Sequence, residues 1–205
     1  MDAWTIGSLL ETATGYLRGK AGDSPRLDAE LLLAYALGLE RIQLYTQYDR
    51  PLTSQEVDAY RALVARRAKH EPVAYIVGTA HFRHLILEVR PSTLIPRPET
   101  EELVDLALQT LRLRPAWLGL EGTDPPGSLA GDDGRLRQDR GGGRTGPPVL
   151  ADVGTGSGAI ALSLAQETGL PVLATDMSAE ALAVAERNRA VAGLDDRVEL
   201  RRADL

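Results

Sequence analysis

The stretch from Leu150 to Gly158, Leu-Ala-Asp-Val-Gly-Thr-Gly-Ser-Gly, constrains the fold of this chain more than any other. A short apolar run, Val149 to Val153, has the length and flanks of a buried parallel strand. Three glycines at every second position follow, and Ala159 to Glu167 then has the apolar spacing of a helix that stops at Gly169. Glycine lets the backbone bend through positive φ and lets a ligand touch main-chain atoms. The stretch therefore predicts a ligand site at a helix N-terminus.

Two carboxylates indicate which ligand this turn accepts. The G-x-G-x-x-G/A pattern of dinucleotide sites is formally matched by Gly154, Gly156 and Ala159. Asp152, however, would repel a pyrophosphate and attract an amino group or a sulfonium. A second apolar strand, Pro171 to Thr175, ends in Asp176, whose carboxylate can accept hydrogen bonds from both ribose hydroxyls. S-adenosylmethionine, an adenosine with cationic groups and no phosphate, fits both acids. A dinucleotide, and a tight turn in which the strand-end acid caps the next helix, remain as alternatives.

Composition narrows the classes of function. With 205 residues, of which 43% are hydrophobic, the chain is long enough for one globular domain and a small second one. The net charge of −6 argues against direct binding of nucleic acid. The absence of cysteine excludes disulfides and thiolate zinc sites and suits a reducing cytoplasm. The histidines lack metal-ligand spacing with carboxylates, so we expect no metal site; they are His70, His81 and His84.

Neither a membrane span nor a signal peptide is expected. The longest apolar stretch, around Leu31 to Leu39, is too short to cross a bilayer. The N-terminus, Met1-Asp2-Ala3-Trp4, has no basic segment of the kind that begins a signal peptide. We expect a cytoplasmic protein without a membrane partner.

Residues 1–71 are expected to form a small helical bundle. Trp4 to Lys20 predicts a first helix, and Ser24-Pro25 predicts the cap and first position of a second. Thr53 and Glu56 form the capping box of a later helix. The second helix has one apolar stripe, made of Leu27, Leu31, Ala34 and Leu37.

Three further segments complete the predicted organisation. Residues 72–113 are expected to form a β-hairpin, from about Thr79 to Ile95, and a connecting helix from Glu99 to Leu113. Residues 114–148 hold nine glycines and five prolines with almost no apolar periodicity, which predicts a flexible insertion. Residues 149–205 continue the ligand domain, with a helix from Ala179 to Ala192 and a third strand from Arg197 to Arg202.

Several stretches together resemble one enzyme family. They are Leu94 to Glu101 (Leu-Ile-Pro-Arg-Pro-Glu-Thr-Glu), Asp152 to Leu162, Ala185 to Asn188, Ser24 to Glu30 and Glu71 to Gly78. In combination they resemble the release factor glutamine methyltransferases, and the resemblance runs through the chain except for residues 114–148. The glycine motif alone is shared by many methyltransferases, whereas Pro-Arg-Pro-Glu-Thr-Glu joined to it is more specific. Sister enzymes that act on a ribosomal protein look similar but usually differ at Pro98 to Thr100.

The resemblance implies an α/β protein: a helical recognition domain and a β-hairpin, then the first half of a seven-stranded, Rossmann-like methyltransferase domain. The implied reaction moves a methyl group from S-adenosylmethionine to the glutamine side-chain nitrogen of the Gly-Gly-Gln loop in a peptide chain release factor. By matching position, the cofactor would be bound by Asp152, Gly154, Thr155, Gly156, Ser157, Gly158, Asp176, Asp204 and Leu205. The site entrance would be lined by Arg97, Pro98, Glu99 and Thr100.

The family's Asn-Pro-Pro-Tyr motif is absent from these 205 residues, whose single asparagine is Asn188. In the family this motif clamps the substrate amide, whose nitrogen is a poor nucleophile, in line with the methyl group. We therefore assign no catalytic residue and expect the chain as given to be inactive. A ribosomal protein glutamine methyltransferase, an NAD-dependent oxidoreductase and a non-catalytic protein-binding module remain as alternatives.

Overall fold

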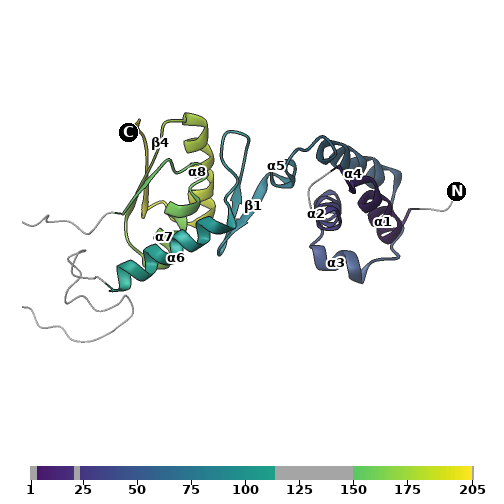
Figure 1. Ribbon diagram of the computed structural model, residues 1–205, viewed down its shortest axis with the longest axis horizontal. Helices are drawn as coiled ribbons and strands as arrows, with labels where there is room; N and C mark the ends of the chain where they lie inside the picture. The colour runs from purple at the N-terminus through teal and green to yellow at the C-terminus, as the bar shows by residue number, and fades with distance from the viewer. Residues whose placement is uncertain (1–3, 21–23, 114–149, 205) are drawn as a thin grey trace, which may run out of the picture. The chain divides into compact units, whose positions relative to one another are not determined.

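The computed structural model describes residues 4–20, 24–113 and 150–204 and groups the chain into two compact units (Figure 1). The helical unit comprises Met1–Ala80 and Val89–Pro91, and the sheet unit comprises His81–Glu88 and Ser92–Leu205. The predicted insertion at 114–148 and the predicted site residue Leu205 lie outside the described residues. The predicted domain boundaries at 71, 113 and 148 stay predictions.

Five helices make up the described part of the helical unit. They are α1 (Ile6–Leu17), α2 (Pro25–Leu37), α3 (Arg41–Thr46), α4 (Ser54–Arg67) and α5 (Val73–Val77). The predicted capping box of α4 is confirmed: Thr53 Oγ1 accepts the N–H of Glu56, and the Glu56 carboxylate accepts the N–H of Thr53. Ser24 is the N-cap of α2 and Pro25 its first residue, as predicted, although the Ser24 side chain makes no capping hydrogen bond.

The core of the helical unit corrects the predicted face of α2. Leu32 and Leu33 are fully buried, whereas Leu27 and Leu31 keep 39% and 37% of their surface exposed. Helix α2 packs against both α1 and α4, so a side of the helix wider than one stripe is buried, and it is centred on Ala29, Leu32 and Leu33. Tyr60 on α4 closes this core and donates its hydroxyl to the carbonyl of Ala29 at 3.0 Å.

The sheet unit contains the α/β elements in the predicted order. After β1 (Thr79–Phe82), in which the chain passes from one unit to the other, come β2 (Leu85–Glu88), α6 (Pro98–Leu113), β3 (Leu150–Val153), α7 (Ala159–Thr168), β4 (Val172–Asp176), α8 (Ala179–Ala192) and β5 (Val198–Arg202). The strands β3, β4 and β5 form a parallel sheet in that order, with Asp152 paired to Ala174 and Asp176 to Arg202. Within the described residues β3 lies at one edge of this sheet.

The hairpin of β1 and β2 is shorter than predicted, because its second strand ends at Glu88 and not near Ile95. Its turn is held by Arg83, which adopts a positive φ of 52°. The Arg83 guanidinium bonds both oxygens of Glu167 at the end of α7, at 2.6 and 2.9 Å, and pairs with Asp105 of α6 at 2.7 Å. The backbone N–H of Arg83 donates to Glu101 at 3.0 Å. These bonds attach the hairpin to both helices, beside which it lies in Figure 1.

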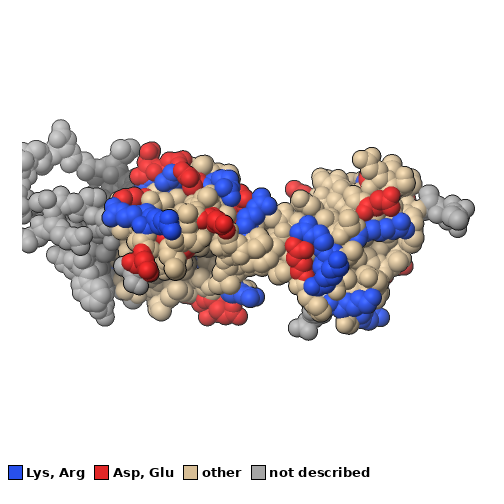
Figure 2. Space-filling view, turned by 90° about the horizontal axis from the view of Figure 1, so that it is seen from above, with Lys and Arg blue, Asp and Glu red and all other residues tan. Residues whose placement is uncertain are grey.

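No helix among the described residues is both long and apolar enough to cross a membrane. On the face shown in Figure 2, basic and acidic side chains are interleaved in each unit. Each unit contains ion pairs, among them Arg187 with Glu88 in the sheet unit and Arg66 with Glu71 in the helical unit.

Candidate functional site

The glycine turn joins β3 to α7 and has two different sides. Gly154, Gly156 and Gly158 all have positive φ, at 79°, 58° and 87°, which side chains disfavour. A Cβ atom added to Gly154 or Gly156 would meet nothing within 4 Å, whereas one added to Gly158 would lie 3.1 Å from Leu162 Cδ1 and 3.5 Å from Ala185 Cβ. The first two glycines therefore face open space, and the third lets α7 pack closely on α8.

Asp152 anchors this turn from the end of β3. Its side chain is almost fully buried, and its Oδ2 accepts two hydrogen bonds: from Thr155 Oγ1 at 2.7 Å and from the N–H of Ala161 at 3.1 Å. Because the N-cap residue, Gly158, has no side chain, Asp152 takes over the capping of the first turn of α7. Burial raises the pKa of Asp152, the hydrogen bonds oppose that shift, and the charge of Asp176 adds to it.

Asp176 ties the turn to the neighbouring strand and helix. Its Oδ2 accepts the N–H of Gly156, and its Oδ1 accepts the N–H of Ser178, each at 2.9 Å. The carbonyl of Thr175, one residue earlier, accepts the N–H groups of Gly154 and Thr155 at 2.9 and 2.8 Å. A carboxylate oxygen can accept more than one hydrogen bond, so Asp176 keeps acceptor capacity for a ligand hydroxyl.

The charges at this turn select against phosphate. A helix N-terminus usually attracts anions, but the carboxylate of Asp152 already occupies the first turn of α7. A pyrophosphate would meet this charge and that of Asp176, with no Lys or Arg among the residues of the turn. The geometry suits a ligand that has hydroxyl groups and a positive charge.

Of the other predicted site residues, some lie within the glycine turn or near it and others lie in a separate segment. Thr155 and Ser157 lie buried within the turn. Asp204 is exposed after β5, and the N–H of Ala203 beside it donates to the Asp176 carbonyl at 3.2 Å, so this chain end lies near the turn. The segment from Arg97 to Thr100 starts α6, with Arg97, Pro98 and Glu99 exposed. No hydrogen bond of the described residues joins that segment to the glycine turn.

One residue that contacts the glycine turn, Asn188, was not predicted as a site residue. Asn188 of α8 is 96% buried and makes three hydrogen bonds, one of them to the carbonyl of Ser157. The sequence does contain a hint of this role, because asparagine has poor helix propensity and this one lies in the middle of an otherwise good helix. Among the described residues, no group of three or more His, Asp or Glu side chains is placed to hold a metal ion.

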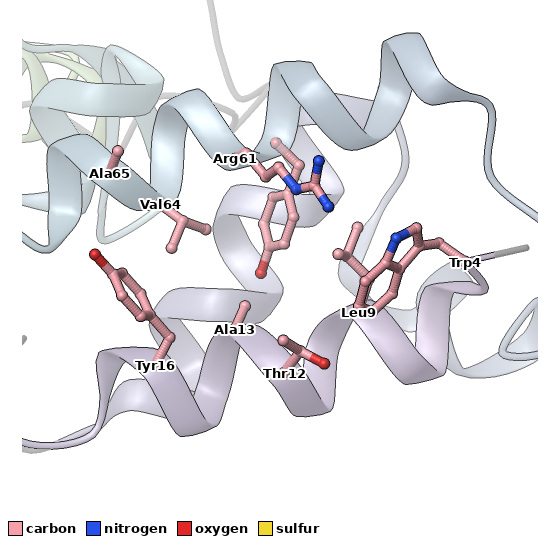
Figure 3. Close-up of a pocket in the computed structure, with 9 residues that line it drawn as sticks. Trp4, Leu9, Thr12, Ala13, Tyr16, Arg61, Val64 and Ala65 are labelled. Atoms are coloured by element: carbon pink, nitrogen blue, oxygen red, sulfur yellow. The ribbon is translucent and has the colours of Figure 1, made fainter. Parts of the chain in front are cut away.

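A separate pocket of about 280 Å³ lies in the helical unit between α1 and α4 (Figure 3). Trp4, Tyr16 and Val64 are among its lining residues, and Arg61 reaches over the Trp4 ring, 5.9 Å from its centre. Its lining is mostly aliphatic and aromatic, with Thr12 and one charged residue, Arg61. Such a lining suits contact with an apolar group better than catalysis.

Comparison with known proteins adds to this geometry. Residues 8–78 match the family described as the PrmC N-terminal domain, and residues 150–205 match the family described as a methyltransferase domain. A release factor glutamine methyltransferase of Chlorobaculum tepidum is 40% identical over 202 residues, and one of Rhodopirellula baltica is 40% identical over 205 residues. Over nearly its whole length, the chain is thus similar to release factor glutamine methyltransferases.

These alignments cover 98% of this chain and 60% of each of the two relatives. A third release factor glutamine methyltransferase, from Geobacter sulfurreducens, is 38% identical over 91% of this chain and 55% of its own length. The chain thus spans somewhat more than half of the length of these curated family members. The glycine turn of this chain falls within the part that matches a methyltransferase domain.

Proposed function

We propose that the sheet unit binds S-adenosylmethionine at the glycine turn. The observation that carries this proposal is the pair of carboxylates, Asp152 and Asp176, on either side of a turn whose first two glycines face open space. When bound, S-adenosylmethionine supplies a methyl group on a positively charged sulfonium. Its amino group and sulfonium match the negative charge at the turn, and it has no phosphate for that charge to repel.

Each residue would then have a distinct task. Asp176 would accept the ribose hydroxyls while its bonds to Gly156 and Ser178 hold it in place. Gly154 and Gly156 would let the methionine part approach the main chain, whereas Gly158 would serve helix packing. Asp152 would shape the turn and supply negative charge for the ammonium group. Asp204, with Leu205, would lie beside the adenine.

We further propose that the complete enzyme methylates the glutamine of the Gly-Gly-Gln motif in peptide chain release factors, in the cytoplasm. Similarity to release factor glutamine methyltransferases and the Pro-Arg-Pro-Glu-Thr-Glu sequence at the start of α6 support this substrate over a ribosomal protein. The helical unit would hold the release factor, and Arg97 to Thr100 would line the entrance to the site. No observation favours an oxidoreductase, because the turn lacks a basic residue for phosphate.

Residues 1–205 alone are proposed not to transfer the methyl group. The single asparagine, Asn188, has its amide nitrogen bonded to two carbonyls, at 3.0 and 2.8 Å, so it is unavailable to clamp a substrate amide. The test is a radiolabelled methyl-transfer assay on an unmethylated release factor, beside a full-length relative. Turnover comparable to that of the relative would refute this part of the proposal.

Calorimetric titration with S-adenosylhomocysteine and with NAD tests the cofactor assignment. We expect S-adenosylhomocysteine to bind more tightly, and Asp176→Ala to weaken its binding by about 1–3 kcal/mol, because hydrogen bonds from the ribose to a charged acceptor are lost. Glu199→Ala, which removes an exposed carboxylate on β5, is the control and should change nothing. Tighter binding of NAD would overturn the assignment.

A further inference from the structure

Asn188 links two parts of the sheet unit that are far apart in sequence. Its Oδ1 accepts the backbone N–H of Glu88, the last residue of the hairpin, at 2.7 Å. Its Nδ2 donates to the carbonyl of Glu88 at 3.0 Å and to the carbonyl of Ser157, in the glycine turn, at 2.8 Å. One buried amide thus joins the hairpin, α8 and the turn.

The chemistry of these three partners requires an amide. They comprise one N–H and two carbonyl groups, so the linking side chain must offer one acceptor and two donors together. Aspartate lacks the donors and leucine lacks both kinds of group. Asparagine is also a poor helix former, and this one stands inside α8 (Ala179–Ala192) among alanines and other good helix formers. Its side-chain bonds offset that local cost.

Attachment of the hairpin alone does not explain Asn188. The neighbouring Arg187 already bonds both carboxylate oxygens of Glu88, at 2.8 and 3.1 Å. Arg187 does not reach the glycine turn, whereas Asn188 does. The additional contact of Asn188 is the one with Ser157, so its distinctive effect falls on the turn.

We propose that Asn188 is a positioning residue that couples docking of the hairpin to the shape of the cofactor-binding turn. The peptide plane between Ser157 and Gly158 is held on both sides: its carbonyl by Asn188, and its N–H by the carbonyl of Thr155 at 2.9 Å. Fixing this plane fixes the main chain that leads back to Gly156. A ligand on the turn and the hairpin on α8 then stabilise each other, because such coupling is reciprocal. The identity of the ligand rests on the proposed function; the mechanical link does not.

The experiment combines ligand titration with hydrogen–deuterium exchange on the whole chain. The variants are Asn188→Ala, which removes all three bonds, Asn188→Asp, which keeps the acceptor but removes the donors, and Arg187→Ala, which loosens only the bond to Glu88. Circular dichroism shows whether each variant is folded. Exchange is followed in peptides that cover the hairpin end and residues 154–162, with and without saturating S-adenosylhomocysteine.

Both Asn188 variants are expected to exchange faster in residues 154–162 without ligand and to bind S-adenosylhomocysteine about tenfold more weakly. In the wild type the ligand should slow exchange at the Glu88 amide; in Asn188→Ala this effect should vanish even at saturation. Arg187→Ala should leave exchange in the turn, the affinity and the ligand effect near wild type. A merely structural role would not remove the effect of ligand on the hairpin.

Three outcomes would overturn the coupling: unchanged exchange in residues 154–162 in both Asn188 variants, an undiminished ligand effect in Asn188→Ala, or an equal loss in Arg187→Ala. If the wild type fails to bind S-adenosylhomocysteine, the proposed function fails, and the exchange of the ligand-free variants still decides the coupling. If Asn188→Ala does not fold, Asn188→Asp supplies the same comparison.

Discussion

The two units each bury a carboxylate, and they satisfy it in opposite ways. In the helical unit, Glu30 of α2 is 4% exposed and pairs with Arg26 at 2.6 Å and Arg41 at 3.7 Å, and it accepts the hydroxyl of Tyr45. The hydrogen bond to Glu30 raises the pKa of Arg26. In the sheet unit, Asp152 is 8% exposed and receives only neutral donors.

The difference separates a carboxylate that completes a fold from one that is suited to a ligand. A buried charge costs free energy unless an opposite charge accompanies it. Glu30 has its cations within the chain. Burial raises the pKa of Asp152, and the charge that acts on it, that of Asp176, is repulsive and raises the pKa further. Perturbed pKa values concentrate at functional sites, so this contrast supports Asp152 as part of a site that receives a cation.

The largest effect is expected at Glu30. Glu30→Gln removes the charge that Arg26 and Arg41 share, and should lower the free energy of unfolding by about 2 kcal/mol. The two arginines are partly exposed and can return to water, which limits the loss. Urea unfolding, followed by hydrogen exchange of peptides from α1 and α2, measures the change. A change below the error of the method would mean that Glu30 is not held by its charge.

Asp152→Asn should not destabilise the protein, in contrast to Glu30→Gln. The asparagine oxygen can still accept the bonds from Thr155 and Ala161, while the buried charge and its repulsion with Asp176 disappear. We expect the stability of the sheet unit at pH 7 to stay equal or to rise by up to about 1 kcal/mol. The affinity for S-adenosylhomocysteine should fall about tenfold as the ammonium loses its counter-charge. A loss of stability with unchanged affinity would reverse our interpretation of Asp152.

The difference in stability between the wild type and Asp152→Asn is expected to depend on pH. Burial raises the pKa of Asp152 above its ordinary value of 3.8, so the folded state holds this proton more tightly than the unfolded state. Asp152 therefore favours folding below about pH 4, and this contribution is lost as the pH rises through the folded pKa. The stability of Asp152→Asn relative to wild type should increase from pH 4 to pH 7. Urea titrations at four pH values measure this difference, and a difference that falls would contradict it.

The smallest losses of stability are expected when one neutral hydrogen-bond donor is removed from Asp152 or from Glu30. Thr155→Val removes one of the two bonds to Asp152 and should cost about 1 kcal/mol. Tyr45→Phe leaves Glu30 its arginines, and Tyr45 is half exposed, so about 0.5 kcal/mol is expected. Thermal unfolding of both variants tests the order. An equal or larger loss in Tyr45→Phe would mean that the arginines contribute little at Glu30.

Local signals predicted the elements well where they were unambiguous. Helix α8 runs from Ala179 to Ala192 as expected, because Ser178 caps it and Gly193 stops it. The inward face of α2 was mispredicted because Leu31, Leu32 and Leu33 are all apolar, and periodicity alone does not choose among them. A strand-end acid that caps the next helix was one of the alternatives open from the sequence, and Asp152 does cap α7. The bond from Asn188 to the turn, by contrast, joins residues 31 positions apart. Such contacts exist only once the strands and helices have come together.

The bond between Arg83 and Glu167 spans 84 positions, and the 36 residues from 114 to 149 make up much of that interval. The entropy of closing a chain segment grows only with the logarithm of its length. Removing those 36 residues would ease this closure by about 0.5 kcal/mol, less than a typical hydrogen bond contributes. The fold thus places almost no thermodynamic barrier against a change of chain length between α6 and β3.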